Sequence, residues 1–338
     1  SVVEHDLIPL LGLVKGGFWM ACCGYSNHRG EPCSEPALED GLCFWHSPDS
    51  DKRGEDVKSR LQEYAKSGRS MSGFKLANSD LAGIDLVNHG QRQGYDLSHA
   101  DLYRANLSGA HLYKLNLSHS SLMKADLTAS NLNEANFQQC NLLGVNLKRA
   151  KIAKIDWGES LRQEALLNQL HGHERLQQID EAEEIYRNLC KTCEAQGFFE
   201  EAGVFFFKEM QMRRRKFPLT DWRHHFYHMI ELFSGYGERP LRVIVFSLMV
   251  IFSCAILYYL LGIQDGGQLI QYQPGQPLAQ MVANFRDCAY FSVVTFTTLG
   301  YGDITPLGNT RILAAIEAFV GSFSIALFVV VFVKKMAR

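Results

Sequence analysis

The chain contains 338 residues, of which 46% are apolar and 21% are charged, and its formal net charge is −2. This length is too great for one small domain and predicts two or three domains. A net charge so close to zero excludes the strongly basic composition that is typical of nucleic-acid binding. Nine cysteines are spread along the chain, and their scatter favours metal binding over a framework of disulfides.

The first segment, residues 1–50, shows no export signal. Its apolar stretch Ile8–Val14 is too short to span a membrane, and no convincing cleavage site follows it. We therefore expect no secretory signal peptide. Residues 51–73 follow as a charged linker, in which we expect a short helix around Glu55–Lys66.

Cysteines and a histidine within residues 1–50 predict a metal site. Cys43 and His46 are three residues apart, so one tight turn can present a thiolate and an imidazole to a single ion. Cys33 and one further cysteine would complete a Cys3His tetrahedron, which is a ligand set that zinc favours. Because so small a segment cannot bury enough apolar surface to fold alone, we expect a structural zinc site. Four of the following residues would be the ligands, with His28 as a weaker alternative and the choice between the first two left open: Cys22, Cys23, Cys33, Cys43 and His46.

Residues 74–157 repeat an apolar residue every five positions. This period matches neither an α-helix nor a flat strand, because it would move the apolar side chains around the axis or between the two faces. The chain must therefore turn a corner every five residues, and four corners would close one coil of a stack. The apolar positions are Leu97, Leu102, Leu107, Leu112, Leu117, Leu122, Leu127, Leu132, Phe137, Leu142, Leu147, Ile152 and Trp157.

A small residue usually stands two positions before each apolar residue, and Asp or Asn stands one position before it. This pattern resembles the pentapeptide-repeat family, which implies a right-handed quadrilateral β-helix. The family is mostly non-enzymatic, so the resemblance implies a scaffold or interaction role and not an enzyme. Leu86 and Leu97 are eleven residues apart instead of ten, which predicts a one-residue bulge or loop within Asn88–Gly94.

Residues 158–217 show helical periodicity with breaks at Gly172 and Gly197, which predicts a helical hairpin connector. Part of it resembles, in spacing, one tetratricopeptide-like hairpin, and we interpret Cys190 and Cys193 as packing residues there. The hairpin ends in the basic cluster Arg213–Lys216, which predicts the cytoplasmic side of a membrane and contact with anionic lipid. Residues 218–238 then predict an amphipathic helix that lies along the membrane surface.

Residues 239–338 contain two apolar segments that are long enough to cross a bilayer. Leu241–Ile263 and Arg311–Val333 span about 23 residues each, and such a helix is long enough for the hydrocarbon core. Residues 264–283 predict a polar loop, and Asn284–Thr297 is apolar but too short to span, as a re-entrant pore helix would be. Basic residues flank the inner side of both spans, so we expect both termini in the cytoplasm.

The run from Thr297 to Asp303, which reads Thr-Thr-Leu-Gly-Tyr-Gly-Asp, lies between these apolar segments. A dehydrated potassium ion needs a cage of oxygens, which backbone carbonyls can supply. Successive carbonyls can point inward only if alternate residues reach positive φ, which Gly300 and Gly302 allow. The run closely resembles the potassium-channel selectivity filter, and the resemblance implies a homotetramer in which each chain supplies a quarter of the site. The implied filter residues are Thr298, Leu299, Gly300, Tyr301, Gly302 and Asp303.

Residues around the filter are predicted to support and gate it. Val294 stands where some bacterial relatives carry a glutamate paired with the position of Asp303. Glu317 lies inside the second span, where an unpaired carboxylate is costly, and we expect it to pack behind the filter, held by pore-helix or filter groups such as Thr295 or Thr297. Gly321 matches the family's inner-helix hinge, and helical spacing places the predicted gate on one face that carries Ser322, Ile325, Val329 and Val333.

The sequence therefore predicts a multidomain bacterial inner-membrane protein that conducts K⁺ passively through an α-helical two-span tetrameric pore. Its implied ligands are K⁺ in the filter and structural Zn²⁺, and its implied surroundings are the lipid bilayer and three further copies. We expect gating from the cytosolic N-terminal part, by a ligand or protein partner that the sequence does not disclose. The alternative is a membrane-anchored scaffold or sensor whose cation pore is vestigial or weakly selective.

Overall fold

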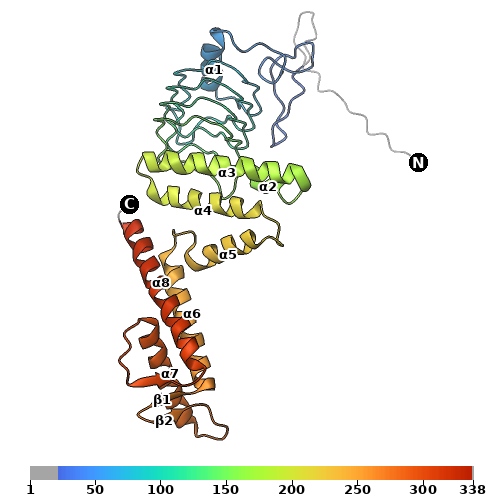
Figure 1. The fold of residues 1–338 in the computed structure, drawn as a ribbon. Coiled ribbons are helices and arrows are strands. Elements are labelled where there is room, and N and C mark those ends of the chain that lie inside the picture. Colours follow the sequence, from blue (N-terminus) through green and yellow to red (C-terminus); the bar gives the residue numbers. More distant parts are fainter. Residues whose placement is uncertain (1–21, 337–338) are drawn as a thin grey trace, which may run out of the picture. The chain divides into compact units, whose positions relative to one another are not determined.

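The computed structural model describes residues 22–336, so the predicted absence of a signal around Ile8–Val14 lies outside the described residues. The chain divides into two compact units, Ser1–Ala165 and Leu166–Arg338. Figure 1 colours both units along the sequence. The first unit holds a stack of short coils, and the second holds helices with one small sheet.

The coils of the first unit form what we call the repeat stack, residues 71–157. Parallel bridges join residues 20 positions apart from Asp96 and Asn116 onward to Asn136 and Asp156. This offset equals four five-residue sides, as the periodicity predicts. The apolar residue of each side is buried in a common interior, where almost all of them are at most 4% exposed.

The corners of the stack explain why Asp or Asn precedes each apolar residue. At one corner the Ala105 N–H donates to the Leu102 carbonyl over 3.0 Å, and Arg104 between them has a φ of +53°, as a type II turn requires. The Asp101 carboxylate accepts a hydrogen bond from the Tyr103 N–H over 3.1 Å, so the acidic side chain pairs a corner N–H that the turn leaves free.

The stack carries one insertion, between Leu86 and Leu97. Bridges before this point join residues 26 positions apart, whereas those after it join residues 20 positions apart, a difference of six residues. The predicted one-residue bulge was therefore wrong in size, although its place was right. The prediction read the eleven residues between Leu86 and Leu97 as two five-residue sides plus one extra residue. In the structure the two leucines lie on consecutive sides, so the eleven residues are one side plus six inserted residues.

The N-terminal end of the repeat stack is covered by α1 (Asp56–Lys66) and by the cysteine-containing segment before it (Figure 1). Trp45 stacks on Phe74 with ring centroids 5.1 Å apart, and Tyr64 of α1 meets the same ring edge-on at 5.2 Å. Lys58 of α1 donates to the Ala82 carbonyl over 2.5 Å. The apolar end of the stack is thereby shielded from water, which an open stack requires. A short helix, α2 (Arg162–Leu166), follows the last coil.

The second unit begins with a helical hairpin of α3 (Gly172–Ala195) and α4 (Phe199–Arg215). The predicted breaks at Gly172 and Gly197 are confirmed, since α3 begins at the first and the second lies between the helices. Cys190 and Cys193 are buried in α3, which agrees with a packing role.

The basic cluster at the end of α4 forms ion pairs within the chain. Arg213 contacts the buried Glu183 and Glu209 over 3.1 and 3.0 Å, and Arg214 contacts Glu231 over 2.7 Å. Lys216 also pairs with Glu183. Acidic side chains of the same unit therefore engage these three residues, and the predicted contact of the cluster with anionic lipid stays a prediction.

The remaining helices of the second unit are α5 (Trp222–Ser234), α6 (Pro240–Leu261), α7 (Leu278–Phe296) and α8 (Thr310–Met336). Within residues 22–336, α6 and α8 are the two helices long and apolar enough to cross a membrane. Pro240 occupies the first turn of α6, where its missing N–H costs nothing. α7, which covers most of the predicted pore helix Asn284–Thr297, begins six residues earlier than the sequence predicts.

The predicted polar loop between α6 and α7 contains a hairpin of β1 (Ile263–Asp265) and β2 (Gln268–Ile270). β1 also pairs with β3 (Ile304–Pro306), which gives the antiparallel order β2-β1-β3. Gly266 and Gly267 both have positive φ, at +51° and +94°, as a type I′ hairpin turn requires. The sheet fixes the chain that follows Thr297–Asp303, which we call the filter stretch, to the end of α6.

Candidate ion-conduction site and candidate metal centre

The filter stretch follows the last turn of α7 and has an alternating backbone. Thr298, Gly300 and Gly302 have φ values of +59°, +55° and +79°. The positive φ expected at the two glycines is thus confirmed, and Thr298 adds a third position, which is unusual for a β-branched residue. Such an alternation is the condition under which successive carbonyls can face one side of the chain. The backbone angles of this stretch therefore permit a line of oxygens.

Both ends of the filter stretch are tied to its surroundings. At the start, the N–H groups of Thr298 and Leu299 donate to α7 carbonyls over 3.0 Å each, the second to Val294. At the end, the Asp303 carboxylate accepts from the Tyr290 hydroxyl of α7 over 2.8 Å. Sequence reasoning found no partner for Asp303 and missed Tyr290, which lies one helical turn before Val294.

Glu317 of α8 is buried, with 1% of its surface exposed, and joins three helices. Its carboxyl group accepts from the Tyr258 hydroxyl of α6 over 2.7 Å and from the Ser292 hydroxyl of α7. Ser292 confirms the expectation of a pore-helix group, but the two residues named as examples, Thr295 and Thr297, are not the partners. The Thr297 hydroxyl donates instead to the carbonyl of Val293 over 2.7 Å. Tyr258 and Ser292 are two of several polar residues on α6 and α7, so the sequence did not single them out.

Gly321 lies against the end of α7. A Cβ atom at this position would come within 2.0 Å of the Phe296 carbonyl oxygen, so only glycine permits this approach. α8 runs without a break through Gly321 from Thr310 to Met336. The structure thus shows a packing role, and the predicted hinge role remains a prediction.

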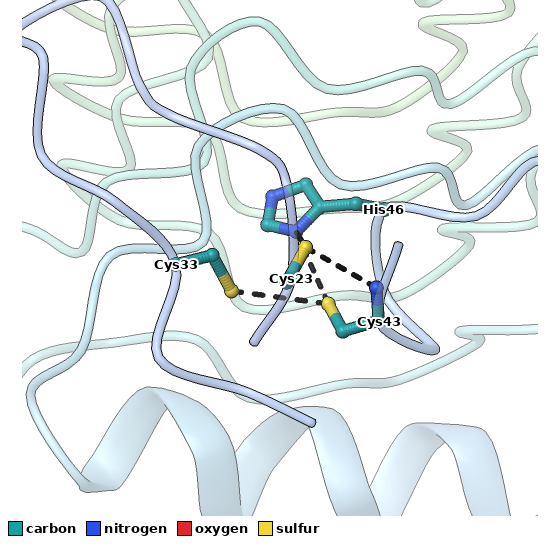
Figure 2. A group of neighbouring side chains, drawn as sticks. All are labelled: Cys23, Cys33, Cys43 and His46. Atoms are coloured by element: carbon teal, nitrogen blue, oxygen red, sulfur yellow. Dashed lines mark hydrogen bonds between the residues drawn. The ribbon is translucent and has the colours of Figure 1, made fainter. Parts of the chain in front are cut away.

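The cysteine-containing segment brings four predicted ligands together. The ligand atoms of Cys23, Cys33, Cys43 and His46 all lie within 4.8 Å of one another (Figure 2). Cys22 is exposed and lies outside the cluster, so the choice left open by the sequence falls on Cys23. A β-bridge between Cys22 and Pro36 directs the neighbouring Cys23 side chain inward, since successive side chains of an extended chain alternate.

The spacing of the four ligand atoms fits a tetrahedral metal. Zinc bond lengths place two sulfurs about 3.8 Å apart and a sulfur and a nitrogen about 3.6 Å apart. The Cys33 and Cys43 sulfurs are 3.9 Å apart, and the Cys23 sulfur lies 3.6 Å from His46 Nδ1. The Cys43 sulfur is closer to this nitrogen, at 3.1 Å. The cluster could therefore hold a metal ion with small adjustments.

The environment of the cluster also suits a cation. The second ring nitrogen of His46 lies 3.0 Å from the Ser72 carbonyl, an arrangement that orients metal-binding histidines. Burial and the nearby Cys43 and Cys23 thiols raise the pKa of the Cys33 thiol to about 12, and burial also raises the pKa of Cys43. Thiolates crowded in this way need a positive ion among them, which would stabilise all three.

Comparison with known families agrees with both parts of the structure. Residues 244–338 match the family profile described as ion channel, and residues 96–128 and 130–154 match pentapeptide repeats, with eight copies. The chain carries an ion-channel domain behind a pentapeptide-repeat domain. Both families are non-enzymatic. No curated protein matches the chain.

Solved structures similar to the chain include pentapeptide repeat proteins from Nostoc. One from Nostoc PCC 7120 is 35% identical over 28% of this chain and 74% of its own, with a TM-score of 0.25. HetL from Nostoc sp. strain PCC 7120, which is involved in heterocyst differentiation regulation, is 30% identical over 26% of this chain and 50% of its own, with a TM-score of 0.14.

Within the ion-channel domain, large side chains of the filter stretch are exposed when one chain is considered alone. Leu299 and Tyr301 are 59% and 67% exposed, although both are large apolar or aromatic residues. The predicted gate residues Ile325, Val329 and Val333 are also exposed, on one face of α8. Apolar surface of this extent on a soluble monomer would be unstable in water, so these faces require lipid or further copies of the chain.

Proposed function

We propose that the chain forms a potassium-selective channel in which four copies surround one pore. The observation that carries this proposal is the positive φ at Thr298, Gly300 and Gly302 in a loop held between two membrane-spanning helices. Carbonyls aimed to one side from four chains would stack into rings of oxygens that replace the water of a K⁺ ion. The ring-forming residues are Thr298, Leu299, Gly300 and Tyr301.

The proposed tetramer follows from the incomplete site of one chain. A single filter stretch surrounds an ion from one side, whereas an ion stripped of water needs oxygens on all sides. Four copies would also cover the exposed Leu299 and Tyr301. The face of α8 that carries Ile325, Val329 and Val333 would line the inner cavity and close it by dewetting.

We further propose a structural Zn²⁺ on Cys23, Cys33, Cys43 and His46, and a right-handed quadrilateral geometry for the repeat stack. A set of three thiolates and one imidazole is typical of closed, structural zinc sites. We place the protein in a bacterial inner membrane with both termini in the cytoplasm, because basic residues flank the inner ends of α6 and α8. With both termini in the cytoplasm, the N-terminal part would lie on the same side of the membrane as the inner end of the pore, and we propose that it controls the opening of the pore.

Potassium flux into liposomes, with sodium flux as the parallel measurement, tests the channel proposal. Gly300→Ala should reduce K⁺ flux by at least tenfold, because Gly300 has a φ of +55° and nothing lies near its Cβ position, so the damage is confined to the backbone. Gly308→Ala is the matched control, since Gly308 has a φ of +53° and equally open space outside the filter. If folded tetramers of the unaltered protein pass no K⁺, the channel proposal is wrong and the scaffold alternative is favoured.

Metal content of the purified protein tests the zinc proposal. Cys23→Ser should lower bound zinc from one ion per chain to a small fraction of that, because a serine hydroxyl is a poor zinc ligand. Cys22→Ser is the matched control, since Cys22 is the adjacent residue but is exposed and outside the cluster. Equal zinc loss in both variants, or no zinc in the unaltered protein, would contradict the assignment.

A further inference from the structure

The three irregular segments of the first unit meet around one hollow. A pocket of about 580 Å³ lies beside the repeat stack, within the size range of small-molecule sites. Its walls come from the hairpin Asn27–Glu31, from the turn Gly68–Ser70 after α1, from the six-residue insertion, and from the face of the stack at Lys114 and Glu134. The insertion thus lies against the hairpin and the turn and forms a pocket wall with them, instead of extending alone into solvent.

The hairpin wall is fixed in place. The Asn27 side chain accepts hydrogen bonds from the N–H groups of Arg29 and Glu31 over 3.0 and 2.9 Å, and it donates to the Glu31 carboxylate over 2.7 Å. The hairpin lies between Cys23 and Cys33, so the metal cluster would hold both of its ends. Arg29 is thereby presented to the pocket by a rigid support.

The inserted loop is held close to the stack at its end and offers unused polar groups. A Cβ at Gly94 would come within 1.9 Å of the Lys114 carbonyl oxygen, so the loop returns in direct contact with the coil. Gln91 and Gln93 line the pocket, and no hydrogen bond within residues 22–336 engages their side-chain amides. These amides are free to bind a ligand.

One basic group of the pocket is available to an oxyanion. Three bases and three acids line the wall. Lys114 pairs with Glu134 over 3.4 Å and Arg69 pairs with Glu35, whereas Asp96 and Glu31 accept hydrogen bonds from the Asn116 and Asn27 amides over 2.8 and 2.7 Å. Arg29 has no acidic partner among the described residues. A guanidinium group presents a planar fork that matches carboxylate and phosphate groups.

We propose that this pocket binds a small polar ligand through a carboxylate or phosphate group, with Arg29 as the anchor and Gln91 and Gln93 as hydrogen-bond donors. This site does not depend on ion conduction, and its ligand would enter from the solution that surrounds the first unit.

Titration calorimetry on the full-length protein in detergent, with inorganic phosphate, AMP, glutamate and citrate as probes, tests this proposal. The first two probes and the last two separate phosphate from carboxylate recognition. Arg29→Ala should weaken the Kd of the bound probe by at least tenfold, and Gln93→Ala should weaken it by a smaller factor. Arg104→Ala is the matched control, because Arg104 is exposed at another corner of the stack and does not line the pocket.

The outcomes are decisive in both directions. Binding of one probe class that Arg29→Ala abolishes and Arg104→Ala preserves supports the site. No binding of any probe at millimolar concentration overturns it, as does binding that both variants leave unchanged. Because heat of binding is read without ion flux, a failure here is separate from a failure of the channel proposal.

Discussion

Glu317 shows how one polar residue can organise an apolar region. Inside a membrane domain an unpaired carboxyl group is costly, yet this one is met by hydroxyls from two other helices, Tyr258 of α6 and Ser292 of α7. Each of the three helices therefore contributes one member to the network. Movement of α8 would break these hydrogen bonds, so the network links the helix that carries the predicted gate to the helix that supports the filter.

Tyr258→Phe should lower the stability of the pore by about 1–3 kcal/mol, because it removes a hydrogen bond and leaves a buried acceptor short of a partner. Thermal unfolding of the full-length protein in detergent measures this change. Tyr259→Phe is the matched control: the neighbouring Tyr259 hydroxyl is buried with no hydrogen-bond partner in the described structure, so its removal should be neutral or slightly stabilising. Equal losses in both variants would argue against the network.

At the scale of elements, the regular parts of the fold were predictable and the irregular parts were not. A five-residue period cannot be satisfied by a helix or a flat strand, so the coils followed from the sequence alone. The apolar spans and the breaks at Gly172 and Gly197 followed from hydropathy and helical spacing. The size of the insertion could not be predicted, because eleven residues equal either two five-residue sides plus one residue or one side plus six residues.

The candidate sites divide in the same way. The filter backbone was predictable because glycine at alternate positions has a direct conformational meaning, whereas the positive φ of Thr298 has no such signal. Cys23 and Cys22 are equivalent in sequence, and only the bridge at Cys22 decides which one points inward. The partners of Glu317 were missed because contacts between helices depend on their packing, which one sequence does not specify. The Asp-Gly-Gly run that closes the β1–β2 hairpin was readable but was taken for a loop.

The α3–α4 hairpin carries a buried charge network whose effect depends on pH. Burial disfavours the charged form of Glu183, yet hydrogen bonds from Lys216 and Arg213 lower its pKa below the ordinary value of 4.5. A lowered pKa in the folded state means that ionised Glu183 stabilises the fold above pH 4.5, and that this contribution disappears as the pH falls through the folded pKa.

Glu183→Gln should therefore lower stability by about 1–3 kcal/mol at pH 7, the lower part of the range reflecting the partly exposed basic partners. The difference from the unaltered protein should narrow as the pH falls below about 4.5, and it should vanish once the pH lies below the lowered pKa of Glu183 in the folded state, where both side chains are neutral. Thermal unfolding at a series of pH values measures this. Glu184→Gln is the control, since Glu184 is the exposed neighbour on the same helix; a pH-independent difference for Glu183→Gln would contradict the charge network.

At the scale of the whole molecule, the chain combines two units with different sources of stability. The first unit buries the apolar sides of the repeat stack, and its N-terminal end is closed by a segment that contains the Cys3His cluster, which could hold a metal ion. The second unit has its own core around Tyr258, Phe291 and Ile263, and its spans need lipid or other copies. Since neither core includes residues of the other unit, each unit should unfold in its own transition.

Removal of the metal should then affect only one of these transitions. With a zinc chelator present, the transition of the first unit should move to lower temperature by several degrees, because the segment that covers Phe74 would lose the ion that holds it together. The transition of the second unit should stay in place, and Cys23→Ser should reproduce the chelator's effect without any chelator. Calorimetry of the full-length protein measures both transitions. One cooperative transition that the chelator shifts as a whole would show that the two units are energetically coupled, and would link the metal centre directly to the stability of the pore.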